Sequence, residues 1–426
     1  MAQFFSTVYQ NEFLAAGAGD VNAIVRVGVQ GAGQAGVVSG PAGEVIIVDI
    51  SGSMGRNDML AAQRAAIVAL QEIIDGTYFA VVAGNHQAYL AYPPVTGGQG
   101  MVRMNARTRR EAQIAVSRFR SDGGTAIGSW LNLTRQVFDS MGPNLTQRHA
   151  LLLTDGTNEH ETPAQLDAAI SAAIGNFQCD CRGIGTSWQV SELRKISDAL
   201  LGTVGIVPMA DQLSAEFGKI MRTSMSRGVA NASLRVWVPQ GGRILFVRQV
   251  SPEVIDLTNR GVQSGAQTVD YPTGSWSDEE RDYHISVRLP ARSVGQEQLA
   301  ARVQFIVGGA AQTQGLVKAN WSADENLTMR INPEVAHYTG QAELASAIQE
   351  GLAAKAAGDL STATTRLGRA VQLANATGNT EATSRLMKIV DVVDAPSGTI
   401  RVKASVNRAD EMALDTASTK TTRVRG

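Results

Sequence analysis

The sequence contains little cysteine. Only Cys179 and Cys181 occur among its 426 residues, two positions apart in a segment that we expect to be a strand. Their side chains therefore point to the same face of that strand. A structural zinc site needs four ligands, and no cluster of Cys or His lies near these two residues in the sequence. We expect two buried free thiols rather than a zinc site.

The chain also lacks a strong net charge, a long apolar run and a signal peptide. Its 38 basic and 39 acidic residues leave a formal net charge of −1, which gives no electrostatic reason to expect nucleic acid or a membrane as the main partner. No segment has the apolar length of a membrane span. The first residues, Met1 to Ser6, lack the basic region and apolar core of a signal peptide. We expect a cytoplasmic protein.

One short segment contains the first candidate metal ligands of the chain. The apolar run from Val45 to Val48 leads into Asp49, and Ser51 and Ser53 follow at every second position. Such a run is typical of a strand that is buried on both faces of a parallel sheet. Ligands bind at the carboxyl ends of these strands. One carboxylate and two hydroxyls there are the hard oxygen donors that Mg²⁺ or Mn²⁺ binds.

This Asp-x-Ser-x-Ser pattern resembles the metal-ion-dependent adhesion site of von Willebrand factor A domains. The family's site has two further members, a threonine and a second aspartate, and this chain has a counterpart of each. Thr125 lies on a glycine-rich loop before a predicted helix, and Asp155 ends a second predicted buried strand. The resemblance therefore implies a Mg²⁺ or Mn²⁺ site made of Asp49, Ser51, Ser53, Thr125 and Asp155.

Strand-like and helix-like segments alternate from Glu44 to Met225. The segment from Asp58 to Asp75, for example, has apolar residues at helical spacing. Parallel strands that are joined by helices form a doubly wound, layered sheet. We expect an α/β, Rossmann-like domain at residues 41–226, and this is the region that resembles a von Willebrand factor A domain.

After Arg227 the spacing of apolar residues changes from helical to alternating. Five alternating segments, separated by Gly and Pro turns, predict an antiparallel β-sandwich at residues 227–332. Residues 1–40 contain one more alternating segment near Val25, which we expect to join the sandwich, and then a Gly-rich linker that runs to Gly43. The predicted fold class is thus an α/β domain inserted in, or followed by, an antiparallel β-sandwich.

The remaining sequence is first helical and then polar. Residues 333–395 have helical patterns that Gly358 and Gly378 interrupt, which predicts a small C-terminal helical bundle. Residues 396–426 have low hydrophobicity, which predicts a flexible, Thr-rich tail. Its threonines stand among basic residues, so the tail is either a phosphorylation segment for a phosphothreonine-binding partner or an unmodified solvated segment.

The resemblance also implies a function. In the family, an Asp or Glu of a protein partner completes the coordination of the ion, so we expect a metal-dependent protein-protein interaction module and no enzymatic activity. Met54 and the loops after Thr125 and Asp155 are expected to border that contact. The layout resembles cytosolic bacterial proteins of this superfamily that accompany signalling components. We therefore expect a place in a bacterial signalling or assembly complex.

Other functions stay open on the sequence. A metal ion with an open position can activate water, so a metal-dependent hydrolase is one alternative, with His149 and His160 the histidines nearest to the motifs. A docking subunit of an ATPase-driven machine is another, although the chain has no Walker motif of its own. A phosphotransfer site of the haloacid dehalogenase type is disfavoured, because Ser51 stands where that pattern has a second aspartate.

Overall fold

The computed structural model describes residues 2–32, 41–94, 100–143 and 145–423. The chain divides into two compact units. One unit combines Met1–Gln34 with Asn231–Gly426, and the other is Ala35–Ala230. The Gly-rich linker that the sequence predicts lies for the most part outside the described residues.

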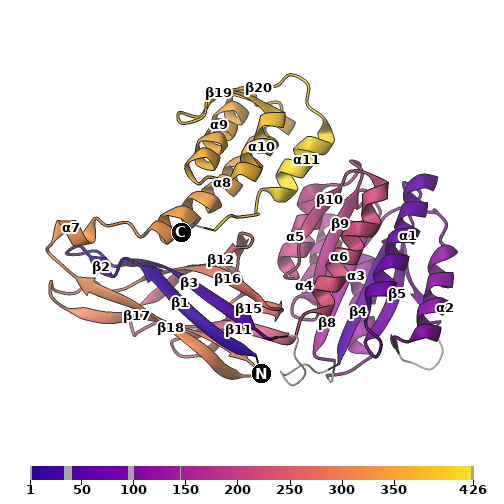
Figure 1. Cartoon of the computed structure of the whole chain (residues 1–426), viewed down its shortest axis with the longest axis horizontal. Helices are drawn as coiled ribbons and strands as arrows, with labels where there is room; N and C mark the ends of the chain where they lie inside the picture. Colours follow the sequence, from indigo (N-terminus) through magenta and orange to yellow (C-terminus); the bar gives the residue numbers. More distant parts are fainter. Residues whose placement is uncertain (1, 33–40, 95–99, 144, 424–426) are drawn as a thin grey trace. The chain divides into compact units, whose positions relative to one another are not determined.

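The unit Ala35–Ala230 is a mostly parallel sheet with helices on both faces (Figure 1). Its strand order is β10-β9-β8-β4-β5-β6, and β7 pairs with β5. The strands are β4 (Ala42–Asp49), β5 (Tyr78–Gly84), β6 (Ala88–Tyr92), β7 (Val102–Arg103), β8 (Gln147–Thr154), β9 (Gln178–Ile184) and β10 (Val204–Val207). Among the described strands of this sheet, β6 and β7 run antiparallel to their neighbour, β5, and the other pairings are parallel. The α/β fold class predicted from the sequence is confirmed.

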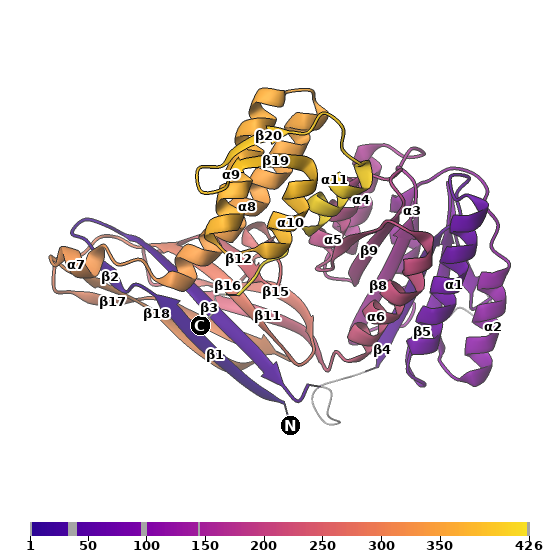
Figure 2. The same cartoon turned by 45° about the horizontal axis from the view of Figure 1, so that its top comes forward.

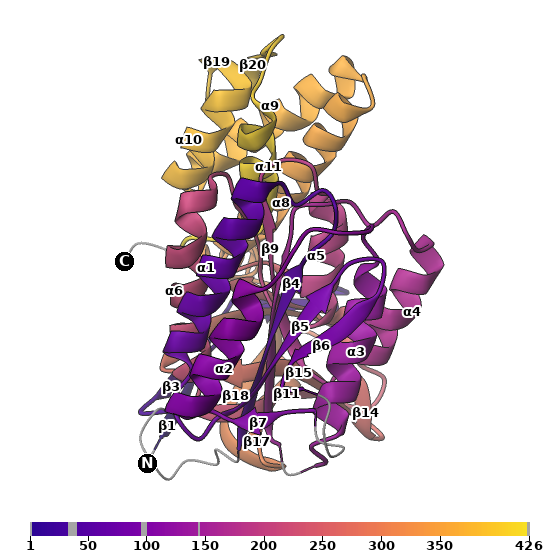
Figure 3. The same cartoon turned by 90° about the vertical axis from the view of Figure 1, so that its right-hand side faces the viewer.

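Figure 3 shows this sheet between two sets of helices. One set is α1 (Arg56–Glu72), α2 (Ala106–Ser117) and α6 (Leu213–Met225), the last preceded by the short helix η1 (Ala210–Gln212). The other set is α3 (Ile127–Asp139), α4 (Pro163–Ala173) and α5 (Val190–Ala199). Because helices cover both faces, the middle of the central strand β4 is apolar, and Val45 to Val48 are fully buried. Cys179 and Cys181 are buried free thiols on β9.

The other unit contains a sandwich of two sheets that are antiparallel except for one short parallel pairing at an edge (Figure 2). The five-stranded sheet has the order β1-β3-β16-β12-β13, and the six-stranded sheet has the order β14-β15-β11-β17-β18-β2. The first is built from β1 (Gln3–Gln10), β3 (Asp20–Gln30), β12 (Arg243–Ser251), β13 (Ile255–Asp256) and β16 (Glu279–Arg288). The second is built from β2 (Phe13–Leu14), β11 (Val229–Trp237), β14 (Val262–Gly265), β15 (Thr268–Trp276), β17 (Glu297–Val307) and β18 (Ala310–Trp321).

The N-terminal segment lies inside the five-stranded sheet. Strand β3 pairs with β16 from Asp20, opposite Arg288, to Val29, opposite Glu279. The α/β unit is therefore an insertion between β3 and β11, both of which are sandwich strands. Arg26 on β3 forms two hydrogen bonds to the fully buried Asp282 on β16, and these join the segments before and after the insertion.

Helices follow the sandwich. They are α7 (Glu325–Thr328), α8 (Pro333–Ala356), α9 (Leu360–Ala376) and α10 (Thr380–Ile389). The side chains of Asn332, Asp359 and Asn379 cap the first turns of α8, α9 and α10. The start of α8 is joined to the sandwich by the Tyr338 hydroxyl, which donates a hydrogen bond to Asp282.

The prediction of a flexible tail is wrong for the described residues after 395. They form a hairpin, β19 (Val390–Asp394) with β20 (Thr399–Val402), and a last helix, α11 (Arg408–Ala417). Leu414 of α11 is buried in the same apolar cluster as Leu344, Leu367 and Leu386. The segment is low in hydrophobicity overall, but these few apolar positions fall on the face of α11 that packs against the other helices.

The residues after α11 bind to the sandwich as an extended segment. Thr421 donates its backbone N–H to the carbonyl of Pro252 (3.0 Å) and its hydroxyl to the carbonyl of Val250 (2.7 Å). Thr422 accepts a hydrogen bond from the Gln341 side chain at 3.1 Å. A kinase would have to detach this segment to reach either threonine.

Deletion of residues 418–426 is therefore expected to loosen α8 and the end of β12. The loss of several hydrogen bonds, each with a net contribution of about 1 kcal/mol, should speed amide exchange in α8 and α11 by at least tenfold. Hydrogen exchange followed by mass spectrometry measures this. Deletion of residues 424–426 alone is the matched control, because it removes none of the contacts named above. Equal exchange in both variants would contradict the role given to the segment.

Candidate metal centre

Asp49 is fixed at the carboxyl end of β4 by two hydrogen bonds. The side chain is fully buried. Its Oδ1 accepts a hydrogen bond from the backbone N–H of Ser51 at 2.7 Å, and its Oδ2 accepts one from the Thr154 hydroxyl at 2.5 Å. The first bond closes a tight turn after the strand, so the chain bends back over the sheet edge immediately after Asp49.

After that turn, side-chain oxygens of Ser51, Ser53 and Asp155 lie close together. The Ser51 and Ser53 hydroxyls lie 2.9 Å apart, and the Ser53 hydroxyl donates a hydrogen bond to Oδ1 of Asp155 at 2.7 Å. Asp155 follows the last residue of β8, the strand that pairs in parallel with β4. The carboxyl ends of two adjacent parallel strands therefore carry both aspartates, as the sequence predicts.

Thr125 reaches the same place from the loop before α3. The backbone N–H of Gly52 donates to the carbonyl of Gly123 at 2.7 Å, which joins this loop to the β4 turn, and Gly123 has a φ of +72°. A methyl group added to Gly156 would lie 2.9 Å from the Ser53 hydroxyl oxygen and 3.1 Å from that of Thr125. Both hydroxyls thus face one point above Gly156. The structure brings all five predicted site residues together.

Burial opposes the ionised form of both aspartates. It raises the pKa of Asp155 to about 6, against a hydrogen bond from Ser53 that lowers this pKa and the negative charge of Asp49 that raises it further. Burial also raises the pKa of Asp49, although the hydrogen bonds from Ser51 and Thr154 partly offset the effect. Two nearby carboxylates with raised pKa values form a site that a positive charge would stabilise.

These residues fit a small divalent cation. Two carboxylates and three hydroxyls form an all-oxygen donor set, which suits Mg²⁺ or Mn²⁺ better than zinc, whose usual ligands are sulfur and nitrogen. Within the described parts of the chain, no group of three or more His, Cys, Asp or Glu side chains is arranged to bind a metal ion. An ion at this site would therefore depend on the hydroxyl oxygens of Ser51, Ser53 and Thr125.

Several supporting residues were not predicted from the sequence. Thr154 binds Asp49 because residue 153 pairs with residue 48 in the sheet, which places Thr154 beside Asp49. The side chains of Asn158 and Glu161 accept hydrogen bonds from the backbone N–H groups of Ile127 and Gly128 at the start of α3. Only the position of Thr154 at a strand end gave a signal in the sequence, since the other contacts depend on how two loops pack.

Two histidines lie over the threonine loop. The ring of His86 lies against Gly123 and that of His160 against Gly124, because a methyl group on either glycine would overlap the ring. His160 also accepts a hydrogen bond from the backbone N–H of Thr125 through Nδ1, at 3.3 Å. Both histidines are exposed, so they border the site on its solvent side.

One predicted border residue is placed wrongly. Met54 is 1% exposed and belongs to the apolar core beneath the sheet edge. Its backbone N–H donates to the carbonyl of Ser51 at 3.1 Å, and this turn directs the side chain inward. Met54 therefore anchors the β4 turn and does not face a partner.

The fold and this site together define a class: an α/β domain whose sheet carries an all-oxygen site at the carboxyl ends of β4 and β8. Comparison with known proteins agrees with that class. Residues 45–158 match the model of the von Willebrand factor type A domain, and residues 372–418 match that of the von Willebrand factor type A C-terminal domain. The comparison with curated proteins found no match.

Solved structures extend the likeness to the whole chain. A von Willebrand factor type A protein from Catenulispora acidiphila is 46% identical, with 99% of this chain and 97% of that chain covered and a TM-score of 0.93. The ArnB paralog VWA2 from Sulfolobus acidocaldarius is 14% identical over 98% of both chains, with a TM-score of 0.60. The human COPII-coat protein Sec24c is 10% identical, with 91% of this chain and 58% of that chain covered and a TM-score of 0.52. The last two show a shared fold alone.

The chain belongs to the von Willebrand factor type A domain family. Domains of this family are generally metal-dependent adhesion or protein-binding modules. No helix among the described residues is long and apolar enough to cross a membrane.

Proposed function

We propose that the chain is a metal-dependent protein-binding module that captures an Asp or Glu of a partner protein. The observation that supports this most directly is the convergence of five oxygen-donor side chains at one sheet edge. Asp49, Ser51, Ser53, Thr125 and Asp155 would hold Mg²⁺ or Mn²⁺ there. A bound ion supplies a coordination position that a carboxylate of the partner can occupy.

The arrangement of the hydroxyls supports a site that is ready to bind. Ser51 and Ser53 already lie within hydrogen-bond distance of each other, and Ser53 of Asp155, so little reorganisation is needed when an ion replaces those hydrogen bonds. Thr154 and the Ser51 backbone hold Asp49 in place. These contacts fix the orientation of the Asp49 carboxylate.

We propose a binding role rather than an enzymatic one. His149, a candidate base in a hydrolase, is buried on β8 between Glu44 and Asp180, several residues before Asp155. His160 uses one ring nitrogen to accept the backbone N–H of Thr125. Neither is therefore free to act as a base beside the site in this arrangement.

Further parts of the function stay predictions. A place in a cytoplasmic bacterial signalling or assembly complex, including one driven by a separate ATPase, is compatible with a binding module. A phosphothreonine-binding partner at the C-terminal segment is also a prediction, and the contacts of Thr421 and Thr422 with the sandwich and α8 count against it.

A pull-down from cell lysate with Thr125→Val tests the proposed function. The substitution keeps the shape of the side chain and removes one hydroxyl ligand. We expect wild type to capture a partner with Mg²⁺ and to lose it with a chelator, and we expect the variant to lose most of it even with Mg²⁺. Cross-linking of the captured partner should place one of its acidic residues next to the Thr125 loop.

Thr134→Val is the matched control. Thr134 is a fully buried threonine on α3 that lies outside the site, and its hydroxyl has no hydrogen-bond partner among the described residues. The control should capture the partner as wild type does. If chelator, Thr125→Val and Thr134→Val all leave the captured proteins unchanged, metal-dependent capture is wrong.

A further inference from the structure

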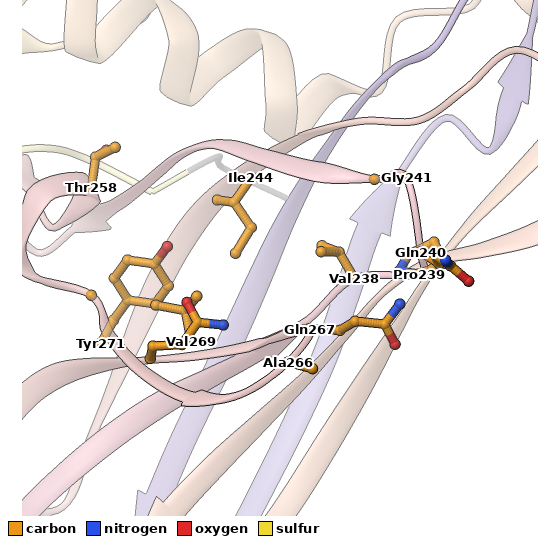
Figure 4. A pocket seen from close by; sticks show the side chains of 13 residues that line it. Val238, Pro239, Gln240, Gly241, Ile244, Thr258, Ala266, Gln267, Val269 and Tyr271 are labelled. Atoms are coloured by element: carbon orange, nitrogen blue, oxygen red, sulfur yellow. The ribbon is translucent and has the colours of Figure 1, made fainter.

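A cavity of about 530 Å³ lies beside the turn between β11 and β12 (Figure 4). Buried Val238 and Tyr271 and half-buried Ile244 and Val269 form its apolar wall. Thr258, Gly261 and residues of the turn before β15 also line it. All of these residues belong to the sandwich, so the cavity is distinct from the candidate metal centre.

The cavity is lined by uncharged residues. None of the thirteen lining residues, all of them in the described part of the chain, carries a charge. The polar side chains are those of Tyr271, Thr258 and three glutamines, and Gln240 and Gln263 are exposed. An ion would enter such a cavity without a counter-charge, which is unfavourable. The wall thus suits a neutral molecule.

Tyr271 supplies a directed hydrogen-bond donor. The residue is 3% exposed, yet among the described residues no group accepts a hydrogen bond from its hydroxyl, which Figure 4 shows at the cavity. The hydroxyl oxygen itself is accessible from the cavity, so it can donate a hydrogen bond to a molecule bound there. Burial raises the pKa of Tyr271, so the phenol stays protonated at neutral pH and can donate.

The backbone beside Tyr271 is shaped to keep its ring in place. A methyl group added to Gly261 would lie 2.9 Å from the Tyr271 ring and 2.5 Å from Val269. Glycine therefore lets the chain pass directly over the ring, which fixes the direction of the hydroxyl. The Thr258 hydroxyl is bonded to the backbone of Val247 and does not reach across to Tyr271.

We propose that this cavity is a binding site for an uncharged small organic molecule. Its apolar part packs against Val238, Ile244 and Val269, and a carbonyl or hydroxyl oxygen accepts the hydrogen bond of Tyr271. Because one water molecule occupies about 30 Å³ of liquid, the volume holds a ligand of on the order of 15 non-hydrogen atoms. That size lies within the usual range for small-molecule sites.

Ligand-observed NMR on the full chain tests the proposal with four probes: benzamide, benzyl alcohol, toluene and benzoate. We expect saturation transfer to benzamide and benzyl alcohol and none to benzoate, which is charged. Tyr271→Phe removes only the hydroxyl, so it should weaken benzamide binding by about fivefold to tenfold, the loss expected for one neutral hydrogen bond, and leave toluene unaffected.

Two further variants distinguish a loss of binding from misfolding. Ala266→Trp places a large ring at the exposed edge of the cavity and should abolish binding of benzamide, while Ala310→Trp, at an exposed alanine of β18, should not. Circular dichroism checks that each variant is folded. Absence of saturation transfer to benzamide and benzyl alcohol, equal benzamide affinity in Tyr271→Phe, or benzoate binding as strong as that of benzamide would each overturn the proposal.

Discussion

Asp155→Asn is expected to stabilise the metal-free α/β unit and to abolish its stabilisation by Mg²⁺. Burial and the charge of Asp49 disfavour the ionised Asp155 in the folded state, where its pKa is raised to about 6 from the ordinary value of 3.8. Full conversion of that shift gives about 3 kcal/mol, and we expect about 2 kcal/mol at pH 7.5 because the carboxyl group borders the open side of the site. Asparagine cannot bind the ion as a carboxylate does.

The pH dependence of this effect has a definite sign. The folded metal-free protein binds one more proton than the unfolded chain between pH 3.8 and about 6. Its free energy of unfolding should therefore rise as the pH falls through about 6, and the part of this rise that comes from Asp155 should be missing in Asp155→Asn. Mg²⁺ acts in the opposite sense, because it binds the ionised carboxylate and should lose affinity as the pH falls.

Hydrogen exchange of the slowest amides of β4 and β8 measures both effects in the full chain. Wild type and Asp155→Asn are compared at pH 7.5 and pH 5, with chelator and with Mg²⁺. Asp58→Asn is the control: Asp58 on α1 raises the pKa of Asp155 only through its charge, so this variant should lower that pKa and keep the stabilisation by Mg²⁺. If Mg²⁺ slows exchange equally in wild type and in Asp155→Asn, Asp155 is not needed for metal binding.

The members of the site were predictable because each belongs to a local pattern. Asp49 and Asp155 end buried strands, and the parallel order of β4 and β8 places such ends side by side. Thr125 was found from the glycine-rich loop and the resemblance to the family. The inward turn of Met54 was not predictable, because it depends on a backbone hydrogen bond to Ser51 and on the core beneath.

The contacts of the C-terminal segment were not predictable from the sequence. Its composition indicates a solvated tail, yet Thr421 forms hydrogen bonds with the carbonyls of Val250 and Pro252, residues about 170 positions away in the chain. Local composition carries no information about such a partner. The insertion of the α/β unit was easier to predict, because the alternating segment near Val25 precedes the α/β pattern and matches the strands that follow it, although β1, which also pairs with β3, was not predicted.

His149→Leu is expected to destabilise the α/β unit by about 3 to 5 kcal/mol, the usual effect of removing one partner from a buried ion cluster. The buried imidazole contacts Oε2 of Glu44 at 2.7 Å through Nδ1 and Oδ2 of Asp180 at 2.9 Å through Nε2. Glu44 also accepts a hydrogen bond from the hydroxyl of Ser224 on α6 at 2.6 Å. Leucine would leave two buried carboxylates without the positive charge between them.

The two kinds of group in this cluster respond to pH in opposite ways. Burial alone would lower the pKa of His149, but the carboxylates of Glu44 and Asp180 outweigh it and raise this pKa above its ordinary value of 6.5. The contribution of His149 is therefore fully present below pH 6.5 and lost as the pH rises through the folded-state pKa. Burial would raise the pKa of Asp180, but His149, Arg227 and Arg182 lower it instead, so its contribution is lost only in strong acid.

The cluster should thus make the wild-type unit less stable as the pH rises from 6.5 to 8.5, a range in which Asp155 is already mostly ionised. The free energy of unfolding, obtained from the exchange of the slowest β8 amides with chelator present, should fall as the pH rises in wild type. It should stay constant in His149→Leu. His86→Leu, at an exposed histidine, is the control and should keep the slope. Adding Glu44→Gln to His149→Leu removes one of the uncompensated charges and should recover part of the lost stability. A double variant no more stable than His149→Leu would mean that lost packing, and not buried charge, explains the effect.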